Sequence, residues 1–142
     1  MREIVSKSLI DRARLASKLS GYPKYHIGAV VFNKGKIYAT GTNSYKGSSL
    51  QLGYNKLYKH CPDGWVGGCT HAEVDALKDL IKTYRNTSLD FSRLSILVYR
   101  EGKDGRYALA KPCPACEHAL RDLGIKDVYY TGNDSIVHER YN

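Results

Sequence analysis

Two short motifs in this sequence have the residue types and the spacing of a metal-dependent hydrolytic site. The first is H-A-E at 71–73, and the second, C-P-A-C at 113–116, begins 40 residues after Glu73. Cysteines three positions apart at a helix start point the same way, so Cys113 and Cys116 can bind one metal ion together with His71. Three protein ligands leave the fourth tetrahedral position of Zn²⁺ for a water molecule, whose pKa falls from about 15.7 to about 7. Glu73 is suited to shuttling the proton of that water.

Each motif alone also fits a structural role. Thr70 and Glu73 have the spacing of a capping box, in which each side chain bonds the other residue's backbone N–H. Cys113 and Cys116 alone fit a redox pair or half of a structural zinc site, which needs a fourth protein ligand. Neither role requires a glutamate beside the histidine. The order H-x-E followed by P-C-x-x-C is typical of zinc deaminases that act on nucleobases.

The hydrophobic pattern predicts the elements that position these motifs. Apolar residues at helical spacing indicate helices over about 3–19 and from residue 70 onward, and a third helix opens at 112–116 and is closed by Gly124. Strands are expected at 27–32, 36–40, 94–99 and 126–131, with a tight turn at 104–105 and a long irregular loop over 41–68. The unbroken apolar run at 27–32 predicts burial on both faces. This order predicts a single α/β domain over residues 1–142, with helices packed on a mixed sheet.

Composition restricts the class of protein. With 142 residues, 42% hydrophobic and 25% charged, the chain resembles ordinary soluble globular proteins and not disordered or disulfide-rich ones. No apolar run approaches the roughly 18 residues that a membrane span requires. The first residues lack the apolar segment of a secretory signal peptide, so we expect a cytoplasmic location and no membrane partner. In that reducing compartment the four cysteines are expected to be metal ligands or thiols.

Positive charge is concentrated in the first part of the chain. Residues 1–60 contain 11 Lys and Arg against 2 Asp and Glu, whereas residues 61–142 contain 11 against 12. Tyrosines alternate with lysines in the basic part, a pattern suited to contacting phosphate and stacking on bases. A solvated basic face with half-buried tyrosines is the alternative. The pattern indicates an anionic partner, either a small nucleotide or a nucleic acid.

Two further segments, at 27–43 and 125–130, are similar to parts of the same protein family as the motifs. The run at 27–43, which ends in Asn43, is similar to the first hairpin of the cytidine and deoxycytidylate deaminase superfamily, and 125–130 is similar to the strand that follows its cysteine helix. The sequence resembles this superfamily over most of its length. The resemblance implies a three-layer, cytidine deaminase-like fold with a five-stranded mixed sheet flanked by helices. It also implies hydrolytic removal of an exocyclic amine with release of ammonia.

The resemblance also implies the roles of individual residues. It implies that His71, Cys113 and Cys116 bind one catalytic zinc ion. It also implies that Glu73 is the proton shuttle. Asn43 is expected to contact the substrate sugar, and the backbone of Ala72 to face the base carbonyl. His26 either stacks on the base or is an ordinary surface histidine.

A cysteine-bearing segment at 59–69 is similar to an insert of deoxycytidylate deaminases, some of which bind a second, structural zinc. His60, Cys61 and Cys69 supply three ligands there, and His26 or His118 would have to supply the fourth. Ordinary buried thiols are therefore favoured over a second zinc site.

These observations predict zinc-dependent hydrolytic deamination of a cytosine nucleotide or nucleoside to the uracil product. The long loop after Asn43 is suited to closing over a small ligand. A deaminase acting on single-stranded DNA or RNA is the first alternative, and a nucleic-acid-binding domain with a structural zinc is the non-enzymatic one. Ala110 and Lys111 precede the P-C motif where many family members carry Thr-Leu, Ser or Glu, which leaves the substrate open. The family's habit of assembling implies a homo-oligomer.

Overall fold

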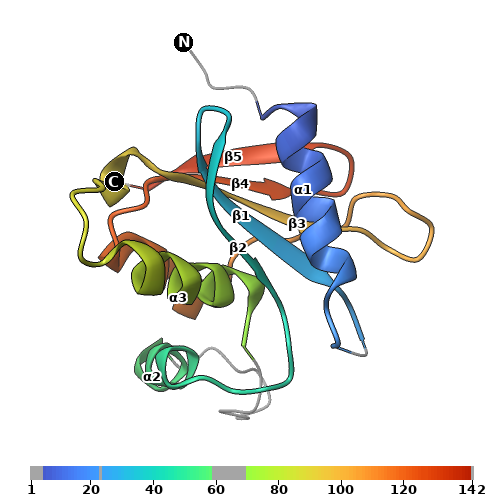
Figure 1. Ribbon diagram of the computed structural model, residues 1–142. Helices are drawn as coiled ribbons and strands as arrows, with labels where there is room; N and C mark the ends of the chain where they lie inside the picture. Colours follow the sequence, from blue (N-terminus) through green and yellow to red (C-terminus); the bar gives the residue numbers. More distant parts are fainter. Residues whose placement is uncertain (1–4, 23, 59–69, 142) are drawn as a thin grey trace.

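The computed structural model describes residues 5–22, 24–58 and 70–141, and these form one five-stranded mixed sheet with helices on both faces (Figure 1). The strands are β1 (Ile27–Asn33), β2 (Lys36–Thr42), β3 (Ser95–Arg100), β4 (Asp127–Thr131) and β5 (Ile136–Arg140). Their order is β2-β1-β3-β4-β5, with β3 and β4 parallel and the other neighbours antiparallel. The mixed sheet implied by the family resemblance is confirmed.

Helices form a layer on each face of this sheet. α1 (Lys7–Lys18) packs against β1 and β3, and α3 (Ala72–Tyr84) packs on the opposite face, mainly against β2 and β1 (Figure 1). α4 (Pro114–Asp122) contacts α3, and α2 (Ser49–Tyr58) contacts α4. A short 3-10 helix, Phe91–Arg93, leads into β3. The three-layer α/β class is therefore confirmed.

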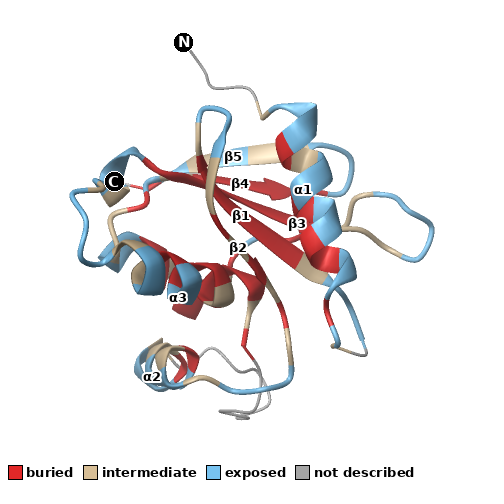
Figure 2. Cartoon of the chain, viewed as in Figure 1, coloured by how far each residue is buried: buried red, intermediate tan, exposed pale blue. Residues whose placement is uncertain are grey.

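The sheet separates two apolar cores. Side chains alternate across a strand, so Val30 and Phe32 of β1 pack toward α1, whereas Ala29 and Val31 pack toward α3. All four are fully buried, and Figure 2 shows the central strands β1, β3 and β4 as mostly buried. The double burial predicted from the unbroken apolar run is confirmed.

Two glycines determine how closely the helices approach the sheet. A Cβ added to Gly28 would lie 2.2 Å from the carbonyl oxygen of Ala13 in α1. A Cβ added to Gly41 would lie 2.3 Å from the backbone nitrogen of Ala76 in α3. Only a residue without Cβ permits these contacts. The backbone of α3 consequently lies directly on β2, which fixes the first turns of α3 relative to the sheet.

Two elements correct the sequence-based expectations. The segment 41–68 is not an irregular loop throughout, because Ser49–Tyr58 form α2; residues 59–68 lie outside the described residues. The buried residues of α2 are the amides Gln51 and Asn55, so its inner face has no apolar stripe for the hydrophobic pattern to detect. The pattern also misses β5, an edge strand whose residues are half-buried or exposed and therefore lack a clear alternation.

The first helix begins later than the expected residue 3. α1 begins at Lys7, because the hydroxyl of Ser6 caps it by accepting a hydrogen bond from the backbone N–H of Leu9 at 3.3 Å; residues 3 and 4 lie outside the described residues. Gly124, at φ +91°, follows Leu123, the C-cap residue of α4, in the expected C′ position, and Gly105, at φ +80°, makes the predicted turn after β3. Across that turn, Glu101 and Tyr107 form an isolated antiparallel bridge. Among the described helices, none is long and apolar enough to cross a bilayer.

Candidate active site

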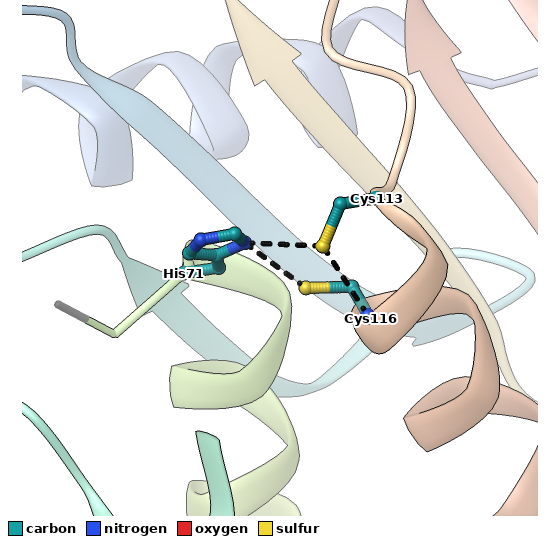
Figure 3. A group of neighbouring side chains, drawn as sticks. All are labelled: His71, Cys113 and Cys116. Atoms are coloured by element: carbon teal, nitrogen blue, oxygen red, sulfur yellow. Dashed lines mark hydrogen bonds between the residues drawn. The ribbon is translucent and has the colours of Figure 1, made fainter. Parts of the chain in front are cut away.

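The side chains of His71, Cys113 and Cys116 converge between the start of α3 and the start of α4 (Figure 3). Nδ1 of His71 lies 3.2 Å from Sγ of Cys116 and 3.5 Å from Sγ of Cys113. The three donor atoms lie within 4.8 Å of one another, and no fourth His, Cys, Asp or Glu joins this group within the described residues. One imidazole and two thiolates are donors that zinc prefers, and three protein ligands leave its fourth position open. The site therefore fits a catalytic zinc ion, whereas a structural one would need a fourth ligand.

The local sequence explains why the cysteines face the histidine. Pro114 occupies the first turn of α4, where its missing N–H costs no hydrogen bond. Cys113 is the N-cap residue of that helix, and its sulfur accepts from the backbone N–H of Cys116 at 3.4 Å. His71 is the N-cap residue of α3. Each helix start carries partial positive charge, which favours thiolates over thiols.

The two thiols differ in their surroundings. Hydrogen bonds from Cys116 and His71 lower the pKa of Cys113 to about 4. The pKa of Cys116 is raised well above its ordinary value by its hydrogen bond to Cys113 and by burial. The pair therefore holds one thiolate readily, and a bound cation supplies the charge that stabilises the second.

Glu73 lies beside the metal cluster and does not cap the helix. Its side chain is 4% exposed, and His71, Cys113 and Cys116 all act on the charge of its carboxylate. Burial raises the pKa of Glu73, and the nearby His71 only partly offsets this. Thr70 donates its hydroxyl hydrogen bond to the carbonyl of Lys46 at 2.7 Å, and α3 has no side-chain cap. The capping-box alternative is therefore wrong.

A residue that sequence reasoning missed holds the start of α3. Gln51 of α2 is 1% exposed, and its Oε1 accepts the backbone N–H of His71 at 2.9 Å. Its Nε2 donates to Oδ1 of Asn55 at 2.9 Å, so the two buried amides orient one another. The one available sequence signal was their spacing of four positions, which places them on the same face of a helix.

A cavity of about 280 Å³ opens next to the metal cluster. His71, Glu73 and Cys113 line it on the catalytic side. Its other walls come from four segments, which lie near the start of β1, after β2, around Thr70 and between β3 and α4. The lining residues of these walls are Tyr22, Tyr25, Ile27, Asn43, Ser44, Thr70, Arg100, Leu109, Ala110 and Lys111. Aromatic and apolar walls with a few polar groups are typical of a small-molecule site.

Asn43 lies in the wall of this cavity, and its amide is held on three sides. Oδ1 accepts from the hydroxyl of Ser20 at 2.6 Å and from the backbone N–H of Ile27 at 2.8 Å. Nδ2 donates to the carbonyl of Tyr25 at 3.1 Å. These three bonds use only one of the two N–H groups on Nδ2, and they fix the direction of the other. Its predicted contact with the sugar stays a prediction.

The other residues that the sequence singled out do not line this cavity or lie outside the described residues. Ala72 is fully buried in the first turn of α3 and is not part of the cavity wall. His26 is exposed, its Nδ1 lies 3.1 Å from the carbonyl oxygen of Ser20, and it lines a neighbouring cavity instead. His118 stacks on Tyr58, with ring centroids 3.7 Å apart. The segment proposed for a second zinc, with Cys61 and its neighbours, lies outside the described residues.

The fold and the site together define a zinc-dependent hydrolase with a buried carboxylate next to its metal ligands. The chain matches the family described as the cytidine and deoxycytidylate deaminase zinc-binding region over residues 4–132, which include the three ligands and Glu73. The chain belongs to this family and is a zinc-dependent deaminase of the cytidine deaminase superfamily.

Solved structures with the same fold act on different bases. Cytidine deaminase from Burkholderia pseudomallei is 20% identical, with a TM-score of 0.65 over 96% of this chain and 93% of that chain. A dCMP deaminase from the cyanophage S-TIM5, solved in complex with dCMP and dUMP, is 22% identical, with a TM-score of 0.58 over 87% and 78%. Guanine deaminase from Bacillus subtilis is 19% identical, with a TM-score of 0.51 over 91% and 65%. At these identities the likeness shows the fold alone. No curated protein matches the sequence.

Proposed function

We propose that this protein deaminates the cytosine base of a free nucleotide or nucleoside to uracil and releases ammonia. The observation that carries the proposal is the buried carboxylate of Glu73 beside the His71, Cys113 and Cys116 cluster, at the wall of a cavity of about 280 Å³. This volume is at the lower end of the range for small-molecule sites and is suited to a single base with its sugar.

Glu73 is the proton carrier of the proposed reaction. His71, Cys113 and Cys116 would hold the zinc ion, which would supply a nucleophilic water at neutral pH. The Glu73 carboxylate accepts a proton from that water and delivers it to N3 of the cytosine ring as the water oxygen bonds to C4. A second proton passes through Glu73 to the exocyclic amine, the C4–N bond breaks, and ammonia leaves as the C4 carbonyl of uracil forms. Apart from the cavity that it lines, Glu73 is buried, which limits its contact with bulk water.

The walls of the cavity support recognition of a base with its sugar. Tyr22 and Tyr25, with ring centroids 4.8 Å apart, line the cavity and offer aromatic surface to a planar ring. The remaining N–H of Asn43 is available to a sugar oxygen. A dCMP deaminase and a cytidine deaminase are among the proteins that share the fold, which favours cytosine, while a guanine deaminase is the competing precedent.

An ammonia-release screen tests the proposal. Zinc-loaded protein is incubated with cytidine, deoxycytidine, their monophosphates, adenosine, guanine and a single-stranded oligonucleotide, and ammonia is measured by a coupled assay. We expect release from at least one free cytosine compound, with a matching loss of cytosine absorbance. Release from guanine, adenosine or the oligonucleotide alone would contradict the proposal. The homo-oligomer and the cytoplasmic location stay predictions.

A further inference from the structure

A second and larger cavity adjoins the catalytic one. Its volume is about 820 Å³, and it lies between the end of α1, the segment before β1 and the turn that follows β3. Tyr25 and Arg100 line both cavities and therefore form the wall between them. The two cavities therefore adjoin at these two side chains.

The lining of the second cavity is strongly basic. Five cationic side chains face it against two carboxylates, with lining residues Arg14, Lys18, Lys24, Arg100, Lys103, Glu101 and Asp104. Glu101 pairs with both Arg14 and Lys18. Within the described parts of the chain, Lys24, Arg100 and Lys103 form no ion pair. Three unpaired cations around one cavity create a site of positive potential that attracts an anion.

Arg100 is the most precisely placed of these cations. It is the last residue of β3, and its guanidinium lies over the ring of Tyr25, 4.9 Å from the ring centroid. Its Nη1 is 3.5 Å from the carbonyl oxygen of Leu109. These contacts hold the side chain at the shared wall, and the planar guanidinium is suited to binding two phosphate oxygens at once.

We propose that the second cavity binds the phosphate of a substrate whose base occupies the catalytic cavity, so that the enzyme acts on a nucleoside monophosphate in preference to a nucleoside. Arg100 contacts the phosphate, and Lys24 and Lys103 add positive charge around it. The inference rests on the proposed cytosine deamination and names its substrate class. Three cations without ion pairs around a single cavity are suited to one phosphate group. A polynucleotide would instead require cations spaced along the path of its successive phosphates.

Steady-state kinetics of two variants test this inference. We expect the wild-type kcat/KM for dCMP or CMP to exceed that for the matching nucleoside by at least about tenfold. Arg100→Gln is expected to lower kcat/KM for the monophosphate by about 10- to 100-fold and to reduce the monophosphate-to-nucleoside ratio. Arg106→Gln is the matched control, since Arg106 belongs to the loop that follows β3 but its side chain is 85% exposed and lines neither cavity.

A second variant and a binding measurement distinguish the effect of losing positive charge from the effect of misfolding. Lys24→Gln combined with Lys103→Gln changes two exposed side chains, and we expect a several-fold loss for the monophosphate that shrinks as salt is raised. Titration calorimetry with the product UMP against uridine is expected to show tighter binding of UMP in the wild type and a smaller difference in Arg100→Gln.

The outcomes distinguish the inference from the proposed function. Equal or better use of the nucleoside, or equal losses in Arg100→Gln and Arg106→Gln, would overturn the phosphate site and leave cytosine deamination intact. Deamination of an oligonucleotide but of no monophosphate would overturn the choice of a free nucleotide. Failure to deaminate any cytosine compound would overturn the proposed function and, with it, this inference.

Discussion

The backbone N–H of His71 donates to the side-chain carbonyl of Gln51 at 2.9 Å, so a buried amide of α2 holds the zinc ligand at the start of α3. A side-chain hydrogen bond to the backbone N–H at a helix start is worth about 1 kcal/mol. Gln51 contacts neither the reacting atoms nor the zinc donors, and we assign it a positioning role.

Replacing this amide should weaken the metal site. We expect Gln51→Leu to lower zinc affinity by about tenfold, because the loss of this hydrogen bond allows His71 to move from its place opposite the cysteines. A chelator competition measures the affinity, and ammonia release on zinc-saturated protein measures activity. Gln51→Glu retains the acceptor and should recover most of the affinity. Lys56→Gln, on the exposed side of the same helix, is the control, and an equal loss there would contradict the positioning role.

Glu73→Gln separates catalysis from metal binding. The amide keeps the shape of the side chain but cannot carry a proton, so we expect zinc content near one per chain and a turnover about 10²- to 10⁴-fold lower. Cys113→Ala should lose zinc and activity together. Zinc is measured by atomic emission and turnover by ammonia release. Asp79→Asn, an exposed position on the same helix, serves as the control, and full activity in Glu73→Gln would remove its catalytic role.

Two glycine substitutions should have opposite effects on stability. In Gly41→Ala the new Cβ would lie 2.3 Å from the backbone nitrogen of Ala76, so α3 must shift, and we expect a loss of at least about 1–3 kcal/mol in the free energy of unfolding. Gly53→Ala adds a Cβ in open space on α2 and should stabilise the protein by about 0.5–1 kcal/mol. Urea denaturation measures both. A Gly41→Ala protein as stable as the wild type would show that the contact is not tight.

The ion pairs of Glu101 should stabilise the protein only above acidic pH. Burial acts to raise the pKa of Glu101, but hydrogen bonds from Lys18 and Tyr99 and the charge of Arg14 outweigh it and hold the pKa below its ordinary value. A carboxylate with a depressed pKa contributes stability above its unfolded pKa, and this contribution is lost as the pH falls through the folded value. We therefore expect Glu101→Gln to cost about 1 kcal/mol near pH 7 and almost nothing once the carboxyl is protonated.

Urea unfolding of both proteins at pH 7, 5 and 3.5 checks the Glu101 prediction. Both proteins keep the same metal site, so its acid sensitivity cancels in the difference between them. Asp134→Asn, an exposed carboxyl in the turn before β5, is the control and should change stability at none of these pH values. A Glu101→Gln difference that is constant with pH would exclude the charge as its cause.

The metal ligands and Glu73 could be predicted from the sequence because their chemistry restricts residue type over short distances. Cys113 and Cys116 lie one helical turn apart, and His71 and Glu73 lie within one turn of another helix. The main strands were predictable for a similar reason, since burial on both faces requires unbroken apolar runs such as 27–32.

The positions of Gln51 and Arg100 depended on the tertiary structure. Gln51 reaches His71 from a helix with a polar inner face, and 20 residues of chain separate the two partners. The side chain of Arg100, at the end of β3, is positioned by the ring of Tyr25, which lies between α1 and β1. Sequence by itself determined the reaction chemistry through local spacing. The shape of the cavities and the charges around them were decided by packing between distant segments, because such contacts leave no periodic signal along the chain.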